Sequence, residues 1–338
     1  MKKQLLMIGI MLVLLTVGLS GCETKQDGDQ LNGAQDETEL EGKIAFSSAE
    51  NIYIINPDGT NEIRLTEGVL LAWSPDGKKI AYGYDGINVM NSDGTDEIKI
   101  NISDSDIPQG LLDFKGIYDF RWSPDGKKIL NTKGCSIDGV YYGGVYTINV
   151  DGSNLDRLVE GWCNSAAFSP DGKKIVYGNG SSCIYIMNYD GTDNTILCEG
   201  ERGYCLMYSP DGNKISYLDS SYEGDLYVMN YDGTDKVKLA ETVWWPTWSP
   251  DGKKIAYSQR NRFGNDPASL YISNPDGTGK VTLIDDVEET YHLYLPHSWS
   301  PDGKKIVYNL DENIYIINID GSDQTQLAVG FYPQWSPQ

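Results

Sequence analysis

Short runs of β-forming residues alternate with polar turns along most of this chain. In one stretch the runs are Ile255-Ala-Tyr, Leu270-Tyr-Ile and Val281-Thr-Leu-Ile, and the segments between them are rich in Asp, Asn, Pro and Gly. Short runs of β-branched and aromatic residues bounded by such segments are typical of β-strands. The pattern predicts an all-β domain over residues 42–338.

Two short turn motifs, here called turn phrases, separate the strands and recur at a spacing of about forty residues. The first is an aromatic residue followed by Ser-Pro, which continues into Asp-Gly in six of its seven copies. The second is Asn-x-Asp-Gly followed by Thr or Ser, which also occurs seven times. The first phrase begins at Trp73, Trp122, Phe168, Tyr208, Trp248, Trp299 and Trp335, and the second at Asn56, Asn91, Asn149, Asn188, Asn230, Asn274 and Asn318.

Both phrases predict hairpin turns. Proline presets the backbone of the first turn position, Asp suits the next, and Gly accepts the left-handed conformation that closes the hairpin. Each repeat is then four antiparallel strands, in which Ser-Pro-Asp-Gly joins the first two and Asn-x-Asp-Gly joins the last two. Four-stranded units at this period predict the blades of a β-propeller.

The ends of the repeated region predict how the propeller closes. The repeats begin at Lys43-Ile-Ala-Phe, which matches the second strand of a unit, and end at Phe331-Tyr-Pro-Gln-Trp, which matches a first strand. The C-terminal strand would therefore join the N-terminal blade and leave no open sheet edge. Six complete units and one shared unit predict seven four-stranded antiparallel blades.

The repeated phrases also resemble those of a known family. W-S-P-D-G-K-K-I, first found at Trp73, and I-Y-I-M-N-x-D-G-T, found at Ile184, are similar to the WD-repeat-like propeller repeats of the TolB family, over residues 43–337. The resemblance implies the same propeller architecture. TolB proteins also have an α/β domain in front of a propeller that usually has six blades, and we expect neither feature here. Prolyl oligopeptidases carry a hydrolase domain beside a related propeller, and we expect no such domain either.

Residues 1–22 have the pattern of a lipoprotein signal peptide. Lys2 and Lys3 precede an apolar stretch, and Leu19-Ser-Gly-Cys22 resembles the bacterial lipobox. The resemblance implies cleavage before Cys22 and lipid attachment to it, although an ordinary signal peptide with an incidental cysteine has the same outline. Residues 23–41 are polar and acidic, which predicts a disordered tether. We therefore expect an extracytoplasmic protein, periplasmic or at the cell surface, that its lipid holds on the membrane.

The charge of the chain bears on its partners. The formal net charge is −22 at pH 7. Nucleic acid is disfavoured as a partner, because its phosphates require a positively charged surface. Part of the negative charge comes from the Asp in every turn phrase, and the simplest interpretation is a solvated acidic surface.

Five cysteines follow Cys22 and raise the question of disulfides. They are Cys135, Cys163, Cys183, Cys198 and Cys205, and none has the close spacing of a zinc site. An oxidising compartment favours pairing, either of Cys183 with Cys198 or of Cys198 with Cys205. A set of buried, reduced cysteines is the third alternative, because free cysteine is a common core residue.

The sequence contains no recognisable catalytic constellation. It has no Gly-x-Ser-x-Gly or His-Glu-x-x-His motif, and its two histidines, His292 and His297, are five residues apart. Some pectate-degrading lyases are similar to this propeller and gather several histidines around a metal, a pattern that is not found here. The Gly of Asn-x-Asp-Gly-Thr comes too early for a calcium loop, which favours a capped turn. We expect no cofactor and no metal; the acidic cluster Asp285, Asp286, Glu288 and Glu289 is the nearest to a metal candidate.

Candidate binding residues lie on one face of the predicted propeller. The two turn phrases share one face and barely vary, whereas the other loops share the opposite face and vary in length. Binding residues are commonly placed on variable loops over a rigid scaffold. Aromatic side chains gather at the strand ends on that variable face. Those outside the regular spacing are our first ligand-binding candidates: Trp162, Trp245, Tyr142 and Tyr291.

Two further candidates have an alternative structural role. Trp244 and Tyr204 each stand four residues before the aromatic of a Ser-Pro phrase and therefore share its strand face. Packing between blades explains such periodic aromatics as well as ligand binding does.

These observations lead to two main hypotheses for the function. The first is a non-catalytic, membrane-anchored propeller that binds a protein, peptide or glycan of the cell envelope through its variable face. The second is a propeller enzyme, a hydrolase or lyase, that acts on an extracellular polymer. A mainly structural scaffold is a third possibility.

Overall fold

The computed structural model describes residues 42–83, 86–100, 119–137, 140–180, 182–220, 224–259, 268–287 and 296–337. All of these residues belong to Leu40–Gln338, the larger of the two units into which the chain separates. They form antiparallel β-strands without any α-helix, so the predicted all-β class is confirmed for this part of the chain. Within these ranges there is accordingly no helix that is long and apolar enough to cross a membrane. The predicted signal peptide with Cys22 and the predicted tether both lie outside the described residues.

Five of the six sheets have four strands each. The first sheet has the order β27 (Phe331–Trp335), β1 (Ile44–Ser48), β2 (Asn51–Ile55) and β3 (Ile63–Glu67). The others are β4–β7 (Val69–Trp73, Lys79–Gly83, Ile87–Asn91, Ile98–Ile100), β8–β11 (Asp119–Trp122, Lys128–Ile137, Val140–Asn149, Asp156–Glu160), β12–β15 (Cys163–Phe168, Lys174–Asn179, Cys183–Asn188, Thr195–Glu199) and β23–β26 (His297–Trp299, Lys305–Leu310, Asn313–Asn318, Thr325–Val329).

The sixth sheet has seven strands because one long strand serves two repeat units. Its strands are β16 (Tyr204–Tyr208), β17 (Lys214–Leu218), β18 (Gly224–Asn230), β19 (Val237–Trp248), β20 (Ile255–Gln259), β21 (Ala268–Ser273) and β22 (Val281–Val287). The first half of β19 pairs with β18 and its second half with β20. β19 is therefore both the fourth strand of one unit and the first strand of the next.

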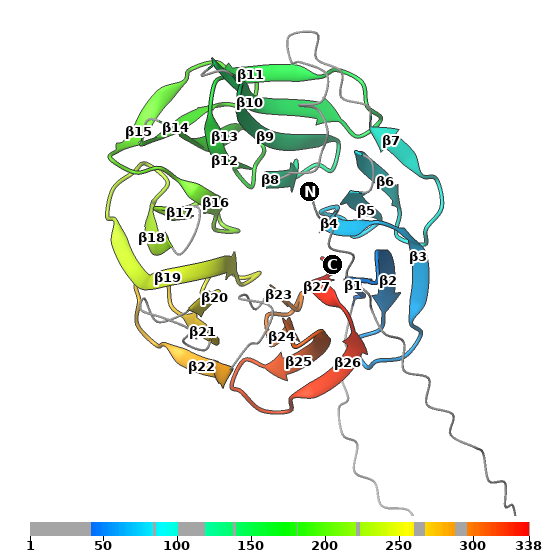
Figure 1. Cartoon of the computed structure of the whole chain (residues 1–338). Coiled ribbons are helices and arrows are strands. Elements are labelled where there is room, and N and C mark those ends of the chain that lie inside the picture. The colour runs from blue at the N-terminus through cyan, green and yellow to red at the C-terminus, as the bar shows by residue number, and fades with distance from the viewer. Residues whose placement is uncertain are drawn as a thin grey trace, which may run out of the picture. The chain divides into compact units, whose positions relative to one another are not determined.

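Figure 1 shows the sheets following one another around a central axis, with the first strand of each unit on the inside. The contacts agree with this order, since β4 contacts β8, β12 contacts β16, and β19 and β27 both contact β23. β27 pairs with β1 in antiparallel fashion, Ile44 with Trp335 and Ser47 with Phe331, although the two strands lie at opposite ends of the described residues. The first and last repeated strands thus meet in one sheet, as the termini of the repeat region predict.

The two turn phrases hold each unit together through their polar side chains. In the unit that begins at β19, the Ser249 hydroxyl donates to Asp251 at 2.7 Å and accepts from the Lys254 amide at 2.9 Å. The Lys254 ammonium in turn donates to the side chain of Asn274, whose amide donates to Thr278, both at 2.8 Å. The Ser249 hydroxyl and the surrounding amides lower the pKa of Asp251. Since these residues fill hydrogen-bonding roles within the turns, the phrases are accounted for by structure alone.

The tryptophans of the Ser-Pro phrases join neighbouring units. The Trp299 indole donates to the Thr247 carbonyl of the preceding unit at 3.2 Å, and the Trp73 indole donates to the Gln334 carbonyl of β27 at 3.1 Å. All of these tryptophans are largely buried. The motif aromatics therefore belong to the interfaces between units, which leaves other residues for binding.

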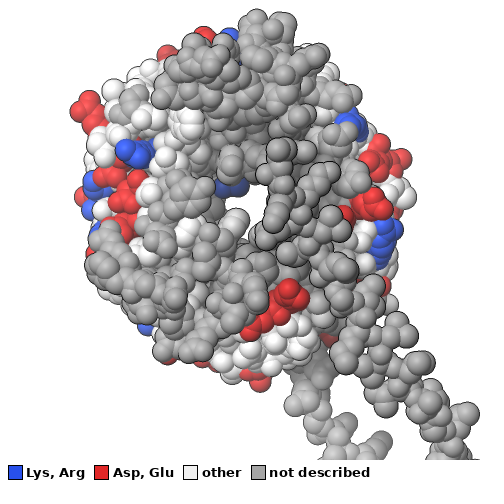
Figure 2. Space-filling view, in the orientation of Figure 1, with Lys and Arg blue, Asp and Glu red and all other residues white. Residues whose placement is uncertain are grey.

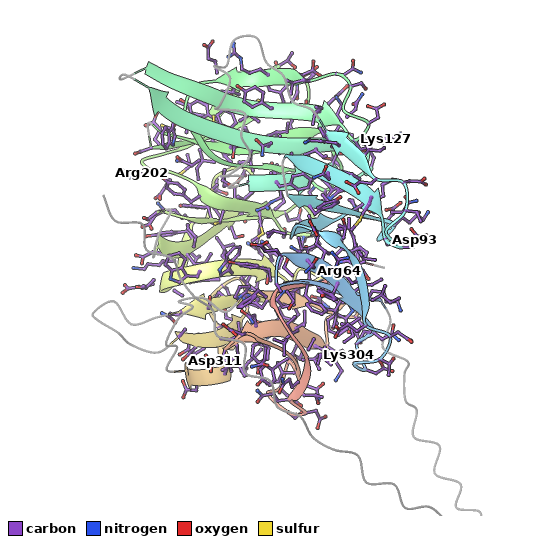
Figure 3. All side chains as sticks on the ribbon, turned by 45° about the vertical axis from the view of Figure 1, so that its right-hand side comes forward. Arg64, Asp93, Lys127, Arg202, Lys304 and Asp311 are labelled. Carbon is purple, nitrogen blue, oxygen red and sulfur yellow. The ribbon has the colours of Figure 1, made fainter. Side chains whose placement is uncertain are left out.

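The two classes of connection lie on opposite sides of the molecule. In Figure 3, Asp93, Lys127 and Lys304, which belong to turn phrases, lie toward one side of the molecule. Arg202 and Asp311, which belong to the other class of connection, lie toward the opposite side. We call these the turn face and the loop face.

Candidate binding site on the loop face

Among the β-bulges of the first strands, three share a residue with a positive φ close to the loop face. In β16, β19 and β27 the register shifts by one residue shortly after the first aromatic of the strand. The residue that follows this aromatic has a positive φ: 48° at Cys205, 51° at Trp245 and 53° at Tyr332. A bulge redirects a side chain, and all three of these side chains are exposed although they belong to inner strands.

The bulges of β19 and β27 bring two aromatic rings together. The centroids of Trp245 and Tyr332 lie 6.5 Å apart, with 57° between the ring planes. The two residues come from different repeat units, and their strands contact β23 from either side. Trp245 is 47% exposed and Tyr332 is 44% exposed, so the pair presents apolar ring surface to solvent. Because Trp245 and Tyr332 are far apart in the sequence, their contact could not be predicted from it.

The backbone at this pair is strained. A left-handed conformation is unusual for bulky residues that are not glycine. Both residues also precede a proline, Pro246 or Pro333, and a following proline favours an extended backbone. Such strain persists only where the surrounding structure enforces it, and it concentrates at functional sites. The two rings are therefore candidates for a binding role.

Trp162 forms a second exposed aromatic surface at the end of β12. Its indole nitrogen donates to the Asn164 side chain at 2.8 Å, and its ring is 41% exposed. The Asn164 amide in turn donates to the carbonyls of Arg202, at 2.8 Å, and Asn179, at 3.1 Å. Gly180 lies against the ring so closely that a Cβ atom there would be 3.2 Å from it. The indole is thus held in one orientation before any ligand arrives.

The other predicted site residues have different surroundings. Trp244 is half-buried, and its carbonyl accepts from the Ser258 hydroxyl at 3.0 Å. Tyr204 is half-buried against a cluster that includes Leu218 and Val243. The backbone of Tyr142 lies in β10, but its side chain is outside the described residues, as is Tyr291 altogether. The structure thus brings neither Trp244 nor Tyr204 into the exposed pair.

Among the described residues, four cysteines form no disulfide: Cys163, Cys183, Cys198 and Cys205. Cys183 stands opposite Glu199, and Cys198 opposite Ile184, so the two cysteines are one residue out of register. Adjacent positions of a strand point to opposite faces, which keeps these two side chains apart. Burial raises the pKa of Cys163 to about 12, which makes it an inert thiol.

Neither the histidines nor the acidic cluster gains a metal-binding arrangement in the described part of the chain. His297 is buried in β23, and His292 lies outside the described residues. Asp285 accepts a hydrogen bond from Ser269 at 3.2 Å, whereas Glu288 and Glu289 lie outside. Over the described ranges, no group of three His, Cys, Asp or Glu side chains is placed to hold a metal ion.

Asn164 is a site residue that the sequence did not indicate, whereas Tyr332 belongs to the aromatics at the strand ends of the variable face but was not among the ligand-binding candidates. A signal for Tyr332 is present, because Trp244-Trp245-Pro and Phe331-Tyr332-Pro read alike and each ends two residues before a phrase aromatic. That signal becomes visible only when the two segments are aligned as equivalent first strands. Asn164 has no such signal.

The visible charges lie mostly away from the centre of the ring. Figure 2 shows an opening at the centre of this view, with red patches of Asp and Glu mainly toward the outer rim. On this face, the described acidic side chains are therefore spread along the periphery rather than gathered in one cluster.

Comparisons with known proteins show which family this chain is similar to. A family model described as the TolB beta propeller domain matches residues 39–224, more than half of the chain. An uncharacterized protein of Agrobacterium fabrum is 27% identical over 246 residues, which cover 60% of this chain and 82% of that protein.

Two solved structures illustrate the range of functions that share the fold. An oligogalacturonate lyase of Vibrio parahaemolyticus is 14% identical, with a TM-score of 0.60 over 82% of each chain. A structure assigned to TolB of Agrobacterium tumefaciens is 19% identical, with a TM-score of 0.52 over 88% of this chain and all of that one. At such identities the likeness concerns the fold alone.

Proposed function

Because the chain belongs to the TolB β-propeller family, we propose that it is a binding protein whose loop face holds a protein, peptide or glycan of the cell envelope. The single observation that carries this proposal is the Trp245–Tyr332 pair, exposed and built on two strained bulges. The buried tryptophans of the Ser-Pro phrases supply the packing between units, whereas this exposed ring pair leaves apolar surface on which a ligand would bind.

The chemistry of the rings indicates the kind of ligand. Tyr and Trp combine a broad apolar face with a polar edge, and they dominate the energetics of many interfaces. Sugar rings, prolines and aliphatic or aromatic side chains all offer a flat apolar face to such surfaces. The fixed indole of Trp162 adds a second platform that loses little conformational entropy on binding.

An enzyme acting on an extracellular polymer is the alternative, and the likeness to an oligogalacturonate lyase favours it. A binding protein and an enzyme differ in whether the ligand is converted into a product. Incubation with polysaccharide and peptide panels, with and without a chelator, should show retention of a ligand on the protein without any product. Chelator-sensitive product formation would replace the binding proposal by the enzymatic one.

We further infer that the propeller has seven blades and that β27 closes it. The inference counts the seven-stranded sheet as two blades that share β19, and the sheet β27-β1-β2-β3 as one blade. Closure is supported by the pairing of β27 with β1 and by the bond from Trp73 to the β27 backbone. A closed ring would hold Trp245 and Tyr332 at a fixed separation.

The lipobox-like segment leads to a proposal for the location. We propose that Cys22 carries a lipid, that residues 23–41 form the tether, and that the propeller lies on the extracytoplasmic side of the membrane. Cys22→Ala should then move the protein from the membrane fraction into the soluble fraction, because a lipid anchor supplies the membrane affinity. Fractionation followed by immunoblotting measures this. Continued membrane association of the variant would exclude the lipid anchor.

A further inference from the structure

The turn between β27 and β1 is held by hydrogen bonds instead of a continuous chain. In the unit that begins at β4, the Ser74 amide donates to the Lys79 carbonyl at 2.9 Å, and the Lys79 amide donates to the Ser74 hydroxyl at 2.8 Å. Ser336 and Lys43 exchange the same two bonds, at 2.8 and 2.9 Å. Lys43 therefore takes the place of the second lysine of a Ser-Pro phrase, in a turn that is open.

This open turn lies on the turn face. Gly77, which ends the neighbouring Ser-Pro-Asp-Gly turn, is so close to it that a Cβ atom on Gly77 would be 2.9 Å from the Pro337 carbonyl oxygen. Gly42 lines the same hollow, of about 450 Å³, as Gly77 and Asp93. Asp93 is one of the turn-face residues in Figure 3. The residues that precede Gly42 are therefore joined to the propeller at its turn face.

The point of attachment limits which face an N-terminal anchor can hold against a membrane. β1 has five residues, which span about 17 Å toward the loop face, and β2 and β3 add about 10 Å between the open turn and the outer rim. A flexible chain as long as residues 23–41 has a root-mean-square end-to-end distance of about 25 Å. The tether would have to exceed this distance and pass around the rim to bring the loop face to the membrane, whereas it brings the turn face there directly.

The side chains of the turn face are compatible with a lipid surface. Lysine and tyrosine are common where proteins meet the membrane–water interface. Tyr189 and Tyr231, which belong to turn phrases, are each 54% exposed. The exposed lysines of the Ser-Pro phrases lie 3.4–3.9 Å from the Asp of their own turns, so their charges are offset locally: Lys78, Lys127, Lys173, Lys253 and Lys304. Such a face can lie beside lipid headgroups while the aromatics of the loop face stay accessible.

From the position of the open turn, we propose that the turn face lies toward the membrane and the loop face points away from it. The ligand of Trp162, Trp245 and Tyr332 then belongs to the envelope beyond the lipid surface, and is a protein or glycan rather than a lipid. This inference rests on the lipid anchor and the loop-face binding proposed above, and it specifies the side from which the partner arrives.

Energy transfer from two positions of the propeller to a lipid acceptor tests the orientation. Full-length, lipid-modified protein is reconstituted on phosphatidylcholine vesicles that carry an acceptor dye on their headgroups. A donor dye is attached through a noncanonical amino acid in place of Lys127, on the turn face, or of Arg202, on the loop face; both side chains are exposed. We expect at least about twofold higher transfer from position 127, because the faces are separated by about 17 Å or more.

A longer tether is the matched control for this orientation. Inserting a second copy of residues 23–41 lengthens the reach of the tether, which grows with the square root of its length. The difference between positions 127 and 202 should then become smaller. Equal transfer from the two positions at the natural tether length, or higher transfer from position 202, would overturn the proposed orientation without affecting loop-face binding.

Two further outcomes separate the orientation from the proposals on which it rests. Failure of the lipid-modified protein to associate with vesicles would overturn the anchor and the orientation together, but it would leave loop-face binding to be measured by capture. Cys22→Ala should not bind plain phosphatidylcholine vesicles. Vesicle binding by Cys22→Ala that is lost when Trp162→Ala and Trp245→Ala are added would overturn the proposal, because the loop face would then be the lipid-binding surface.

Discussion

Deleting residues 331–338 should abolish the cooperative unfolding transition of the whole propeller. The deletion removes β27, whose Trp335 is almost fully buried. Loss of a buried tryptophan side chain alone costs about 3–5 kcal/mol, against a typical total stability of about 5–15 kcal/mol. It also removes the pairing partner of β1 and leaves that strand as an open sheet edge. Urea unfolding followed by near-ultraviolet circular dichroism measures the effect.

The hydrogen bonds of this segment explain why the effect should reach beyond one sheet. The Trp73 indole, in the following unit, donates to the Gln334 carbonyl, and the Trp335 amide bonds to Ser298 of the preceding unit at 3.2 Å. Ser336 exchanges two further bonds with Lys43, at 2.9 and 2.8 Å. One strand therefore links three units.

Two single variants separate closure from a general sensitivity of this segment. Trp335→Ala keeps the strand and should lower the free energy of unfolding by about 3–5 kcal/mol. Tyr332→Ala removes an exposed ring from the same strand and should leave the unfolding curve close to that of wild type. An unchanged transition in the 331–338 deletion would mean that β27 does not close the ring.

Gly178→Ala should cause the second large loss of stability. A Cβ atom at this position would lie 2.2 Å from the Gly203 carbonyl and 2.3 Å from the Arg202 carbonyl, both backbone atoms that cannot rotate away. The connection between β15 and β16 would have to move, which should lower the free energy of unfolding by about 1–3 kcal/mol or more. The same shift would disturb the Arg202 carbonyl that anchors Asn164. Denaturant unfolding of the purified variant provides the measurement.

Gly180→Ala is the matched control, two residues further along. There the added Cβ would meet the Trp162 side chain at 3.2–3.3 Å, and a side chain can move by a few tenths of an ångström. We expect little change in stability but an altered fluorescence of Trp162. Equal losses of stability in Gly178→Ala and Gly180→Ala would contradict the packing that we describe around the C-terminal end of β13.

The turn chemistry made most of the fold predictable from the sequence. Pro, Asp and Gly at fixed offsets specify hairpins, and their repetition specifies the units, as the paired strands around Ser249 and Asn274 illustrate. The bulges were not predictable in the same way, because the residues that adopt positive φ there are Cys205, Trp245 and Tyr332 rather than glycines. A backbone conformation that tertiary packing imposes cannot be predicted from the local sequence.

The candidate site could be predicted only in part for the same reason. Trp162 and Trp245 stood out because they break the regular spacing of aromatics, and both are exposed. The pairing of Trp245 with Tyr332 depends on how two strands approach β23, which no local pattern encodes.

The measurement that tests the central claim most directly is affinity capture from the native cell envelope. Wild-type protein is compared with Trp162→Ala/Trp245→Ala and with Tyr189→Ala/Tyr231→Ala, after all three have been shown to be equally stable. Tyr189 and Tyr231 are each 54% exposed but belong to turn phrases, on the opposite face, so they control for the loss of exposed aromatic area. Removing two aromatic anchors of an interface typically weakens binding at least tenfold. We predict a protein or glycan that wild type and the tyrosine variant retain and that the tryptophan variant loses. Equal capture by all three proteins would contradict a binding role for the loop face and would favour the enzymatic alternative.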